Sequence, residues 1–297
     1  MEPVPQPQVK PGAAESSRIL RQSGGAFPVQ GKARFCLSGP DCPRYLNGQL
    51  TIDIYRLQPG QARRALLLSA KGRLCAPIQI WSEGTGFIIE TEESLLEETT
   101  ARLERYIISD DVMISRPVDD PPVYHVFGAA IPEAVLQINR IGISGYDCIV
   151  PPAGIPAADS SGVDLLRIEN GVPRWGSELT ADTLPQEAGL DRSSVDFDKG
   201  CYVGQEVVSR LRSVGRVNRL LHRFSGTLPL PLDLPVSLIS KDDPRRVAGT
   251  LTSAACDFEL AQTLALGYLN REFVDARHFL AADAAGTVIG ELEKRPV

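Results

Sequence analysis

The sequence is poor in residues that hold metals and disulfides, and those it has do not cluster. It contains six cysteines and three histidines in 297 residues. No two cysteines form a C-x-x-C pair, and the histidines make no H-x-x-x-H pattern. This spacing argues against a disulfide scaffold, and against a zinc site or iron–sulphur cluster bound by this chain alone. We therefore expect no metal site.

Long apolar runs are also lacking. No stretch of about 18 consecutive apolar residues occurs, which excludes a membrane-spanning helix, and the start of the chain lacks the apolar centre of a secretory signal. Lys and Arg number 31 against 37 Asp and Glu, a net charge of −6. A protein with this net negative charge is not expected to bind nucleic acid or an anionic membrane over its whole surface. These features predict a cytoplasmic protein without membrane contact.

The two ends of the chain differ in pattern from its middle. Residues 1–25 are rich in Pro, Gln, Gly and Ser and predict a disordered lead-in. From about Leu221 onward, short strand candidates alternate with Gly, Pro and Asp, which predicts an all-β module, a small barrel. Between them, helix and strand patterns alternate in the manner of an α+β fold.

Several elements of this middle region can be predicted individually. Asp41 lies in a turn and is expected to cap a following helix, and two strands should flank the turn at Lys71-Gly72. Ser94 begins a capping box, so the clearest helix should start there and run to about residue 109. A second, short helix is expected at 132–137.

The segment DKGCYVGQE at 198–206 is the most unusual in the chain. The apolar spacing after it predicts a helix, so Cys201 should lie just before a helix N-terminus. The positive end of that helix and the adjacent Lys199 would both favour the thiolate. Packing of a small cysteine in a tight turn is the alternative.

The segment from 199 to 223 is strongly basic. It contains one Lys and five Arg against Glu206 alone, so 6 − 1 = +5 in an acidic chain. Arginine forks suit carboxylates and phosphates, so the segment could serve a carboxylate tail, RNA or an acidic partner. A solvated helix face is the alternative. Aromatic residues for base stacking are lacking beyond Tyr202 and Phe224, so direct nucleic-acid binding is not expected.

Arg167 and Glu169 form a second candidate site. Read as an extended stretch, LRIENG places both side chains on the same side, where the carboxylate could accept hydrogen bonds from a ring amidine. A structural salt bridge explains the pair equally well.

Taken together, these segments resemble the YgfZ-type folate-binding family, which is related to the T-protein (aminomethyltransferase) of the glycine cleavage system. The residues that carry the resemblance are LSGPDCPRYLNGQLTID at 37–53, KGR at 71–73, LRIENGVPRWGSELTADTLPQEAGLD at 166–191, FDKGCYVGQEVVSR at 197–210 and GRVNRLL at 215–221, with GTLTSAA and LALGYLNRE further on.

The resemblance implies an α+β fold, a T-protein-like ring of three domains around a folate pocket. Residues 26–50 with 140–221 would form a discontinuous first domain that carries the KGCYVGQE motif. Residues 51–139 would form an inserted ferredoxin-like domain, and 222–297 the small β-barrel.

The resemblance also implies a function: a tetrahydrofolate-binding accessory protein in assembly or repair of iron–sulphur clusters. Its partners would be folate and iron–sulphur client proteins, including radical tRNA-modifying enzymes. Cys201 carries over as the functional thiol. The motif around it comprises Lys199, Gly200, Tyr202, Gly204, Gln205 and Glu206. The folate contacts would include Glu169, where T-proteins bind the pterin ring, together with Arg167, Arg210 and Arg219.

One departure from the T-protein pattern bears on the chemistry. T-proteins place a catalytic aspartate after a Gly-Gly turn, whereas the matching residues 71–76 here, KGRLCA, contain no carboxylate. Without a general base or electrostatic help at that position, aminomethyl transfer is disfavoured. A folate-dependent one-carbon transferase remains the alternative function, and whether the chain is an enzyme is left open.

Overall fold

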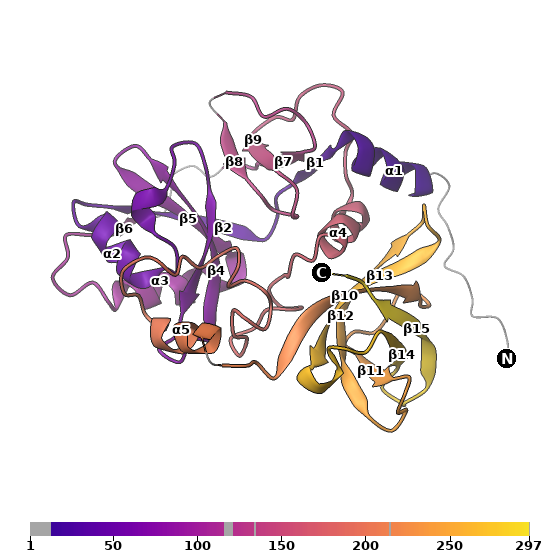
Figure 1. Cartoon of the computed structure of the whole chain (residues 1–297). Helices are drawn as coiled ribbons and strands as arrows, with labels where there is room; N and C mark the ends of the chain where they lie inside the picture. Colours follow the sequence, from indigo (N-terminus) through magenta and orange to yellow (C-terminus); the bar gives the residue numbers. More distant parts are fainter. Residues whose placement is uncertain (1–12, 116–120, 134, 214, 297) are drawn as a thin grey trace.

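A computed structural model describes residues 13–115, 121–133, 135–213 and 215–296 of the chain. In Figure 1, helix α4 (Ser160–Glu169) lies centrally among three bodies: a five-stranded sheet with two helices, a small four-stranded sheet, and a barrel built from the C-terminal strands. This arrangement confirms the predicted α+β class.

The C-terminal region closes into a barrel with strand order β10-β13-β12-β11-β14-β15. Its strands are β10 (Arg219–Thr227), β11 (Val236–Ser240), β12 (Val247–Asp257), β13 (Gln262–Asn270), β14 (His278–Ala282) and β15 (Val288–Lys294). In its core the fully buried rings of Phe224 and Phe279 meet edge to face, with centroids 5.8 Å apart. The predicted barrel is confirmed, and closure leaves these short strands no open edge.

The five-stranded sheet is antiparallel, in the order β3-β4-β5-β2-β6. Its strands are β2 (Lys32–Ser38), β3 (Arg63–Leu68), β4 (Leu74–Glu83), β5 (Gly86–Glu92) and β6 (Met113–Ser115). Helices α2 (Cys42–Gln49) and α3 (Leu96–Glu104) share an apolar core with one face of this sheet. The order β6-β2-β5-β4 with two crossing helices is ferredoxin-like, and β3 adds an edge strand. This unit combines β2 and α2 with strands that follow residue 51, and the division of the chain into domains stays a prediction.

The predicted elements of this unit differ from the structure at their ends. The helix after Asp41 is present, but the Asp41 carboxylate accepts a hydrogen bond from the Asp111 amide at 2.8 Å instead of capping the helix. The helix predicted from Ser94 begins only at Leu96 as α3, after a 3₁₀ turn η2 (Glu93–Leu95), and no side chain caps it. It ends at Glu104 rather than near residue 109.

The small sheet has the order β1-β7-β9-β8. Its strands are β1 (Gly25–Pro28), β7 (Tyr124–Phe127), β8 (Leu136–Ile138) and β9 (Gly145–Cys148). The prediction of a helix at 132–137 is wrong where the structure describes the segment, because Leu136 and Gln137 belong to β8 and pair with β9. A six-residue segment has too little helical propensity to outweigh the hydrogen bonds that it gains by pairing with the edge of β9.

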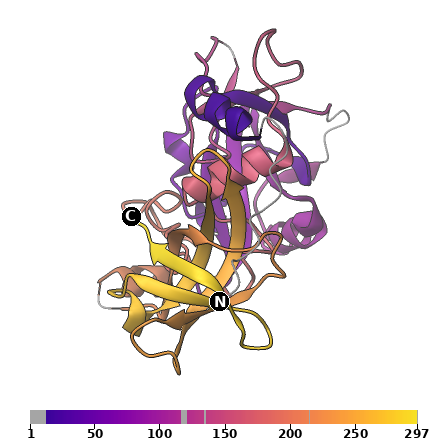
Figure 2. The same cartoon turned by 90° about the vertical axis from the view of Figure 1, so that its right-hand side faces the viewer.

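The N-terminal segment is more ordered than its composition predicts. Residues 13–23 form helix α1 (Ala13–Ser23), whereas residues 1–12 lie outside the described part of the chain. Leu20 packs in an apolar cluster with Phe127 and Leu166. Arg21 forms ion pairs with Glu169 on α4 and with Asp257 and Glu259 on the barrel, at 2.7–3.0 Å. In Figure 2, α1 lies above α4 and the barrel lies below it. These contacts order a polar helix that would not be stable alone.

A buried ionic network joins the two sheets. Arg140 donates to Glu90 of β5 at 2.6 and 2.9 Å, and to Asp147 of β9 at 2.5 and 3.0 Å. His125 on β7 contacts the same Asp147 carboxylate at 3.0 Å. Burial raises the pKa of Glu90, but the guanidinium groups of Arg140 and, to a lesser degree, Arg34 more than offset this, so the pKa lies below its usual value. Both carboxylates are therefore ionised at neutral pH.

Among the described residues, no helix is both apolar and long enough to span a membrane. Nor do these residues bring together three or more His, Cys, Asp or Glu side chains as a metal site.

Replacing Arg140 should strongly destabilise the fold. In Arg140→Gln, Glu90 and Asp147 lose the cation that bonds both of them directly. Among the described arginines and lysines, only Arg34 then remains paired with these two buried carboxylates, at 3.0 and 3.7 Å. The free energy of unfolding should therefore fall by about 3–5 kcal/mol. Urea titration followed by circular dichroism measures this loss. The control Arg56→Gln breaks an ion pair with Asp53 in which the arginine is 60% exposed, and should cost about 0–1 kcal/mol. Equal losses in the two variants would contradict the role assigned to Arg140.

Candidate functional site

One face of the five-stranded sheet carries a row of polar side chains across four strands. Arg64 on β3 pairs with Gln79 on β4, Gln79 pairs with Glu90 on β5, and Glu90 pairs with Arg34 on β2. Directly paired residues of antiparallel strands point to the same side of a sheet, so the four side chains lie on one face. The alternate residues, among them Ala65 and Ile89, point into the apolar core under α2 and α3.

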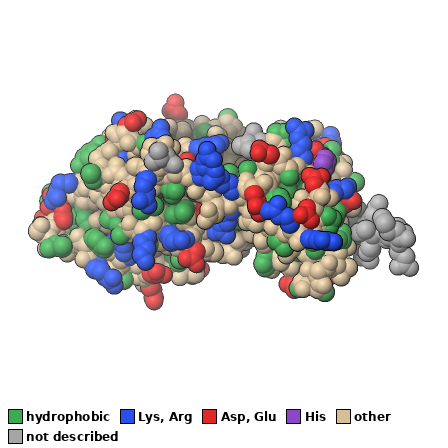
Figure 3. Space-filling model, turned by 60° about the horizontal axis from the view of Figure 1, so that its bottom comes forward, with side chains coloured by type: hydrophobic (Ala, Val, Ile, Leu, Met, Phe, Trp, Pro, Cys, Tyr) green, Lys and Arg blue, Asp and Glu red, His purple; other side chains and the backbone are tan. Residues whose placement is uncertain are grey.

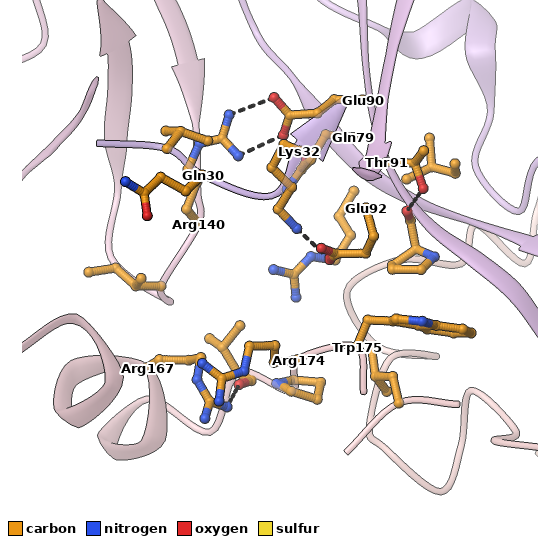
Figure 4. Close-up of a pocket in the computed structure, with 18 of the residues that line it drawn as sticks. Gln30, Lys32, Gln79, Glu90, Thr91, Glu92, Arg140, Arg167, Arg174 and Trp175 are labelled. Atoms are coloured by element: carbon orange, nitrogen blue, oxygen red, sulfur yellow. Dashed lines mark hydrogen bonds and ion pairs between the residues drawn. The ribbon is translucent and has the colours of Figure 1, made fainter. Parts of the chain in front are cut away.

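This polar face forms one wall of a cavity of about 210 Å³, referred to below as the central cavity. Figure 4 shows the opposite wall, where Arg167 of α4 and the following Arg174 and Trp175 lie across from Glu90 and Glu92. Apolar side chains complete the lining, including Leu66, Ile78, Val172, Leu179 and Leu190. A concave site with apolar walls and few polar groups suits a small, flat organic ligand.

Nearly every charged side chain of the central cavity is already paired. Glu90 is bound by Arg140, and Glu92 by Lys32. Asp164 accepts from Arg167 at 3.2 Å and from Arg174 at 2.8 Å. The lining carboxylates are thus neutralised, which makes them poor general bases but leaves oxygens that can accept further hydrogen bonds.

Arg64 is the exception among these charges. No described residue accepts a hydrogen bond from its guanidinium or lies within ion-pair distance of it, although Arg64 lines the cavity. Burial lowers the pKa of Arg64, and the neighbouring Arg140 lowers it further. The charge of Glu92 acts in the opposite direction, but Glu92 makes no ion pair with Arg64. Among the described residues, Arg64 is therefore the cation of the site that has no direct partner.

The KGCYVGQE segment lies elsewhere, against the C-terminal end of α2. The Lys199 ammonium donates to three backbone carbonyls, those of Asn47, Leu50 and Ile52, at 2.6–2.7 Å. The amide of Val203 donates to the carbonyl of Gly48 at 3.2 Å. A helix ends with unpaired carbonyls and partial negative charge, so a lysine there is doubly favourable. Burial lowers the pKa of Lys199 to about 8, and it remains charged at neutral pH.

Two glycines bring this segment against the turn between β3 and β4. A Cβ on Gly204, whose φ is +86°, would lie 2.6 Å from the Ser69 carbonyl oxygen. A Cβ on Gly72, whose φ is +70°, would lie 2.9 Å from the Val207 side chain. The KGR and KGCYVGQE motifs therefore require glycine because they pack on each other.

Cys201 is exposed in the loop before α5 (Gln205–Ser213), so its predicted place just ahead of a helix is confirmed. The neighbouring Tyr202 is buried in an apolar cluster, whereas Glu206 in the first turn of α5 is exposed. The hydrogen bonds of Lys199 go to carbonyls at and just after the end of α2, so Lys199 anchors the loop. Cys201 is not among the residues that line the central cavity.

Of the four predicted folate contacts, only Arg167 lines the central cavity. Arg210 is exposed on α5, and Arg219 donates to Glu187 at 3.1 Å near the barrel. Glu169 pairs with Arg21 at 3.0 Å, outside the cavity. The folate role of these residues stays a prediction.

The extended conformation expected around Arg167 and Glu169 is wrong. Both lie in the last turn of α4, where residues two apart do not share a face. The helix forms because the Asp159 carboxylate caps it, accepting a hydrogen bond from the Gly162 amide at 2.8 Å. Arg167 is instead fixed in place by Glu178 at 3.1 Å and by the Ser253 hydroxyl at 2.9 Å.

The sequence reasoning missed Arg64, Gln79 and Trp175. A signal for Arg64 exists in the strand RRALLL, where it alternates with Leu66 and Leu68 and so belongs to an inward-facing series. A charged residue in such a series is uncommon and calls for a partner. Trp175 lies in a turn, where periodicity gives no information.

The predicted basic segment does not form one continuous surface. Lys199 is buried, and Arg219 and Arg223 are held by Glu187 and the Glu169 carbonyl. Figure 3, which brings the side of α5 forward, shows Lys and Arg side chains gathered there. The exposed cations of α5 and the adjoining segments are Lys71, Arg73, Arg210, Arg212 and Arg216.

The chain is similar to curated proteins of three kinds, although no protein-family model matches it. The tRNA-modifying protein YgfZ of Klebsiella pneumoniae is 26% identical over 286 residues, covering 85% of this chain and 87% of that protein. The mitochondrial iron-sulfur cluster assembly factor IBA57 homolog of Phaeosphaeria nodorum is 28% identical over 232 residues, covering 69% of this chain and 56% of that protein. The aminomethyltransferase of Synechocystis is 21% identical over 329 residues, covering 94% of this chain and 86% of that protein.

A solved structure shares the fold. The crystal structure of glycine cleavage system aminomethyltransferase T from Bartonella henselae matches with a TM-score of 0.78 at 15% identity, over 98% of this chain and 90% of that one. The T-protein-like fold predicted from the sequence is thereby confirmed, and so is the resemblance to YgfZ-type proteins and aminomethyltransferases.

Replacing Lys199 should destabilise the whole loop that carries the thiol. Lys199→Met leaves three buried carbonyls without a donor, which should lower the free energy of unfolding by about 2–3 kcal/mol. The loss is measured by urea titration. The control Lys71→Met, at an exposed lysine of the adjoining turn, should stay within about 0.5 kcal/mol of wild type. A Lys199→Met variant as stable as the control would contradict the anchoring role.

Proposed function

We propose, on the premise of this likeness to YgfZ-type proteins and aminomethyltransferases, that the chain is a tetrahydrofolate-binding accessory protein. It would assist assembly or repair of iron–sulphur clusters in client enzymes and act through Cys201. The relatives named as a tRNA-modifying protein and as an iron–sulfur cluster assembly factor support this class of role. Radical tRNA-modifying enzymes are the clients that the resemblance favours, and the cytoplasm is the proposed compartment.

The observation that carries the proposal is the setting of Cys201. Its thiol is the exposed one among six free cysteines, on a loop that Lys199 and Gly204 hold against two neighbouring segments. An exposed thiol on a rigid support can meet a cluster, or a cluster-bearing protein, without rearrangement of the fold. The exposed cations of α5 next to it would suit an acidic client surface.

The central cavity supports the folate part of the proposal. Trp175, Leu66 and Ile78 offer apolar surface to a flat ring, and Glu92 and Asp164 keep oxygens that can accept from the amino and ring N–H groups of a pteridine. Tetrahydrofolate would bring one-carbon carrier chemistry to this site. The residues named here would bind and orient it and exclude water.

The alternative is a folate-dependent one-carbon transferase, and the shared fold with an aminomethyltransferase favours it. The chemistry of the site argues against it. The carboxylates that line the central cavity are paired with cations, and the turn at residues 71–76 contributes none. A proton acceptor for aminomethyl transfer is therefore lacking among these residues.

Tetrahydrofolate should bind the wild-type chain at micromolar concentration in anaerobic calorimetric titration. Trp175→Leu removes the ring that the pteridine would contact and should weaken binding at least tenfold, because aromatic contacts contribute about 1–3 kcal/mol. Glu169→Gln, outside the cavity, should bind like wild type. A loss confined to Glu169→Gln would instead place the pterin where the resemblance to T-proteins implies, and no binding by wild type would refute the folate proposal.

Cys201→Ser should abolish the support of cluster-dependent enzymes in cells that lack the native protein, with at least a tenfold drop in client activity. Folding and tetrahydrofolate binding should be unchanged, because the side chain is exposed and lies outside the cavity lining. Cys256→Ser, at a partly buried cysteine of the barrel, is the control and should retain full support. Full rescue by Cys201→Ser would remove the thiol from the proposed mechanism.

A further inference from the structure

Arg64 lies where two cavities adjoin. Besides the central cavity it lines a second one of about 400 Å³, and the two share Gln79, Val172, Pro173 and Leu190 as well. The neighbouring Arg63 also lines the second cavity. The two cavities therefore adjoin at Arg64 and at these shared residues.

The two cavities differ in charge. Three carboxylates line the central cavity, those of Glu90, Glu92 and Asp164. The described residues that line the second cavity include two arginines and no carboxylate. Arg63 is held by a two-pronged pair with Asp196 at 2.9 Å, so its charge is matched. Arg64 has no such partner among the described residues, and on the side of the second cavity the described lining offers it no carboxylate.

The size of the cavities adds a second argument. Pockets that hold a whole drug-sized ligand usually measure about 300–1,000 Å³. The central cavity, at about 210 Å³, is smaller, so it suits the ring end of a longer molecule. The second cavity provides room for the remainder, and its lining includes hydrogen-bonding side chains such as Asn139, Asn170 and Ser193.

We infer that Arg64 binds a carboxylate of the ligand, and that the second cavity holds the acidic tail whose ring occupies the central cavity. This inference rests on the proposed function, because it assigns the two ends of a folate-class ligand to the two cavities. A guanidinium fork can bind a carboxylate through two parallel hydrogen bonds, which explains an arginine at this position. Arg64 thus selects ligands with an acidic tail over bare pterins.

The test compares two probes on the full-length chain: tetrahydrofolate and 6-methyltetrahydropterin, which has the ring but no acidic tail. Arg64→Gln should weaken tetrahydrofolate binding about 10- to 100-fold, the usual effect of losing a charge-assisted hydrogen bond. It should leave 6-methyltetrahydropterin binding within about twofold of wild type. Arg105→Gln, at an exposed arginine beyond α3, is the control and should change neither.

Stability gives an independent measurement. A partly buried charge that has no ion-pair partner and is partly desolvated adds little stability without ligand. The urea midpoint of free Arg64→Gln should therefore equal or exceed that of wild type. A large drop would indicate a structural role and overturn the inference.

The binding outcomes separate the inference from the proposed function. If wild type binds tetrahydrofolate and Arg64→Gln binds it equally well, the tail assignment is wrong while the folate proposal survives. If Arg64→Gln weakens both probes to the same extent, Arg64 contacts the ring and the tail assignment is again wrong. If wild type binds neither probe, the proposed function itself fails.

Discussion

The arrangement of the site depends on the buried guanidinium of Arg140. Its carboxylate partners come from different sheets, Glu90 from the five-stranded sheet and Asp147 from the four-stranded one. Burying the charges of Arg140, Glu90 and Asp147 without their partners would cost much free energy. Packings that leave any of these charges unpaired are therefore strongly disfavoured. The network therefore fixes how the sheets meet. Because Glu90 also belongs to the polar row of the sheet, the same interaction sets one wall of the central cavity.

What the sequence predicted well rests on local patterns. The barrel follows from short strands bounded by turn residues, and the start of α5 follows from the apolar spacing after Gly204. Each of these inferences needs only residues within one turn or one strand of each other.

What the sequence did not predict rests on pairs that are distant in the chain. Arg21 orders α1 through residues 148 and 236 positions away, so composition alone indicated disorder. In place of the helix expected at 132–137, the structure has a strand that pairs with β9. The polar row through Arg64 can be recognised only when the strand register is known. The folate candidates were chosen by resemblance and local charge, and three of the four lie outside the cavity lining.

The separation of the thiol from the cavity constrains how they could act together. Cys201 lines no part of the cavity, but one apolar cluster reaches both: Leu66, Leu179 and Leu190 line the cavity and pack with Tyr202 and Val208. A close-packed cluster transmits displacement because it contains no space to absorb it. We therefore expect a ligand that shifts Leu66 to act on the thiol loop through this cluster, which includes Tyr202, the neighbour of Cys201. Coupling between folate and thiol would then depend on packing at Tyr202 rather than on contact between ligand and sulfur.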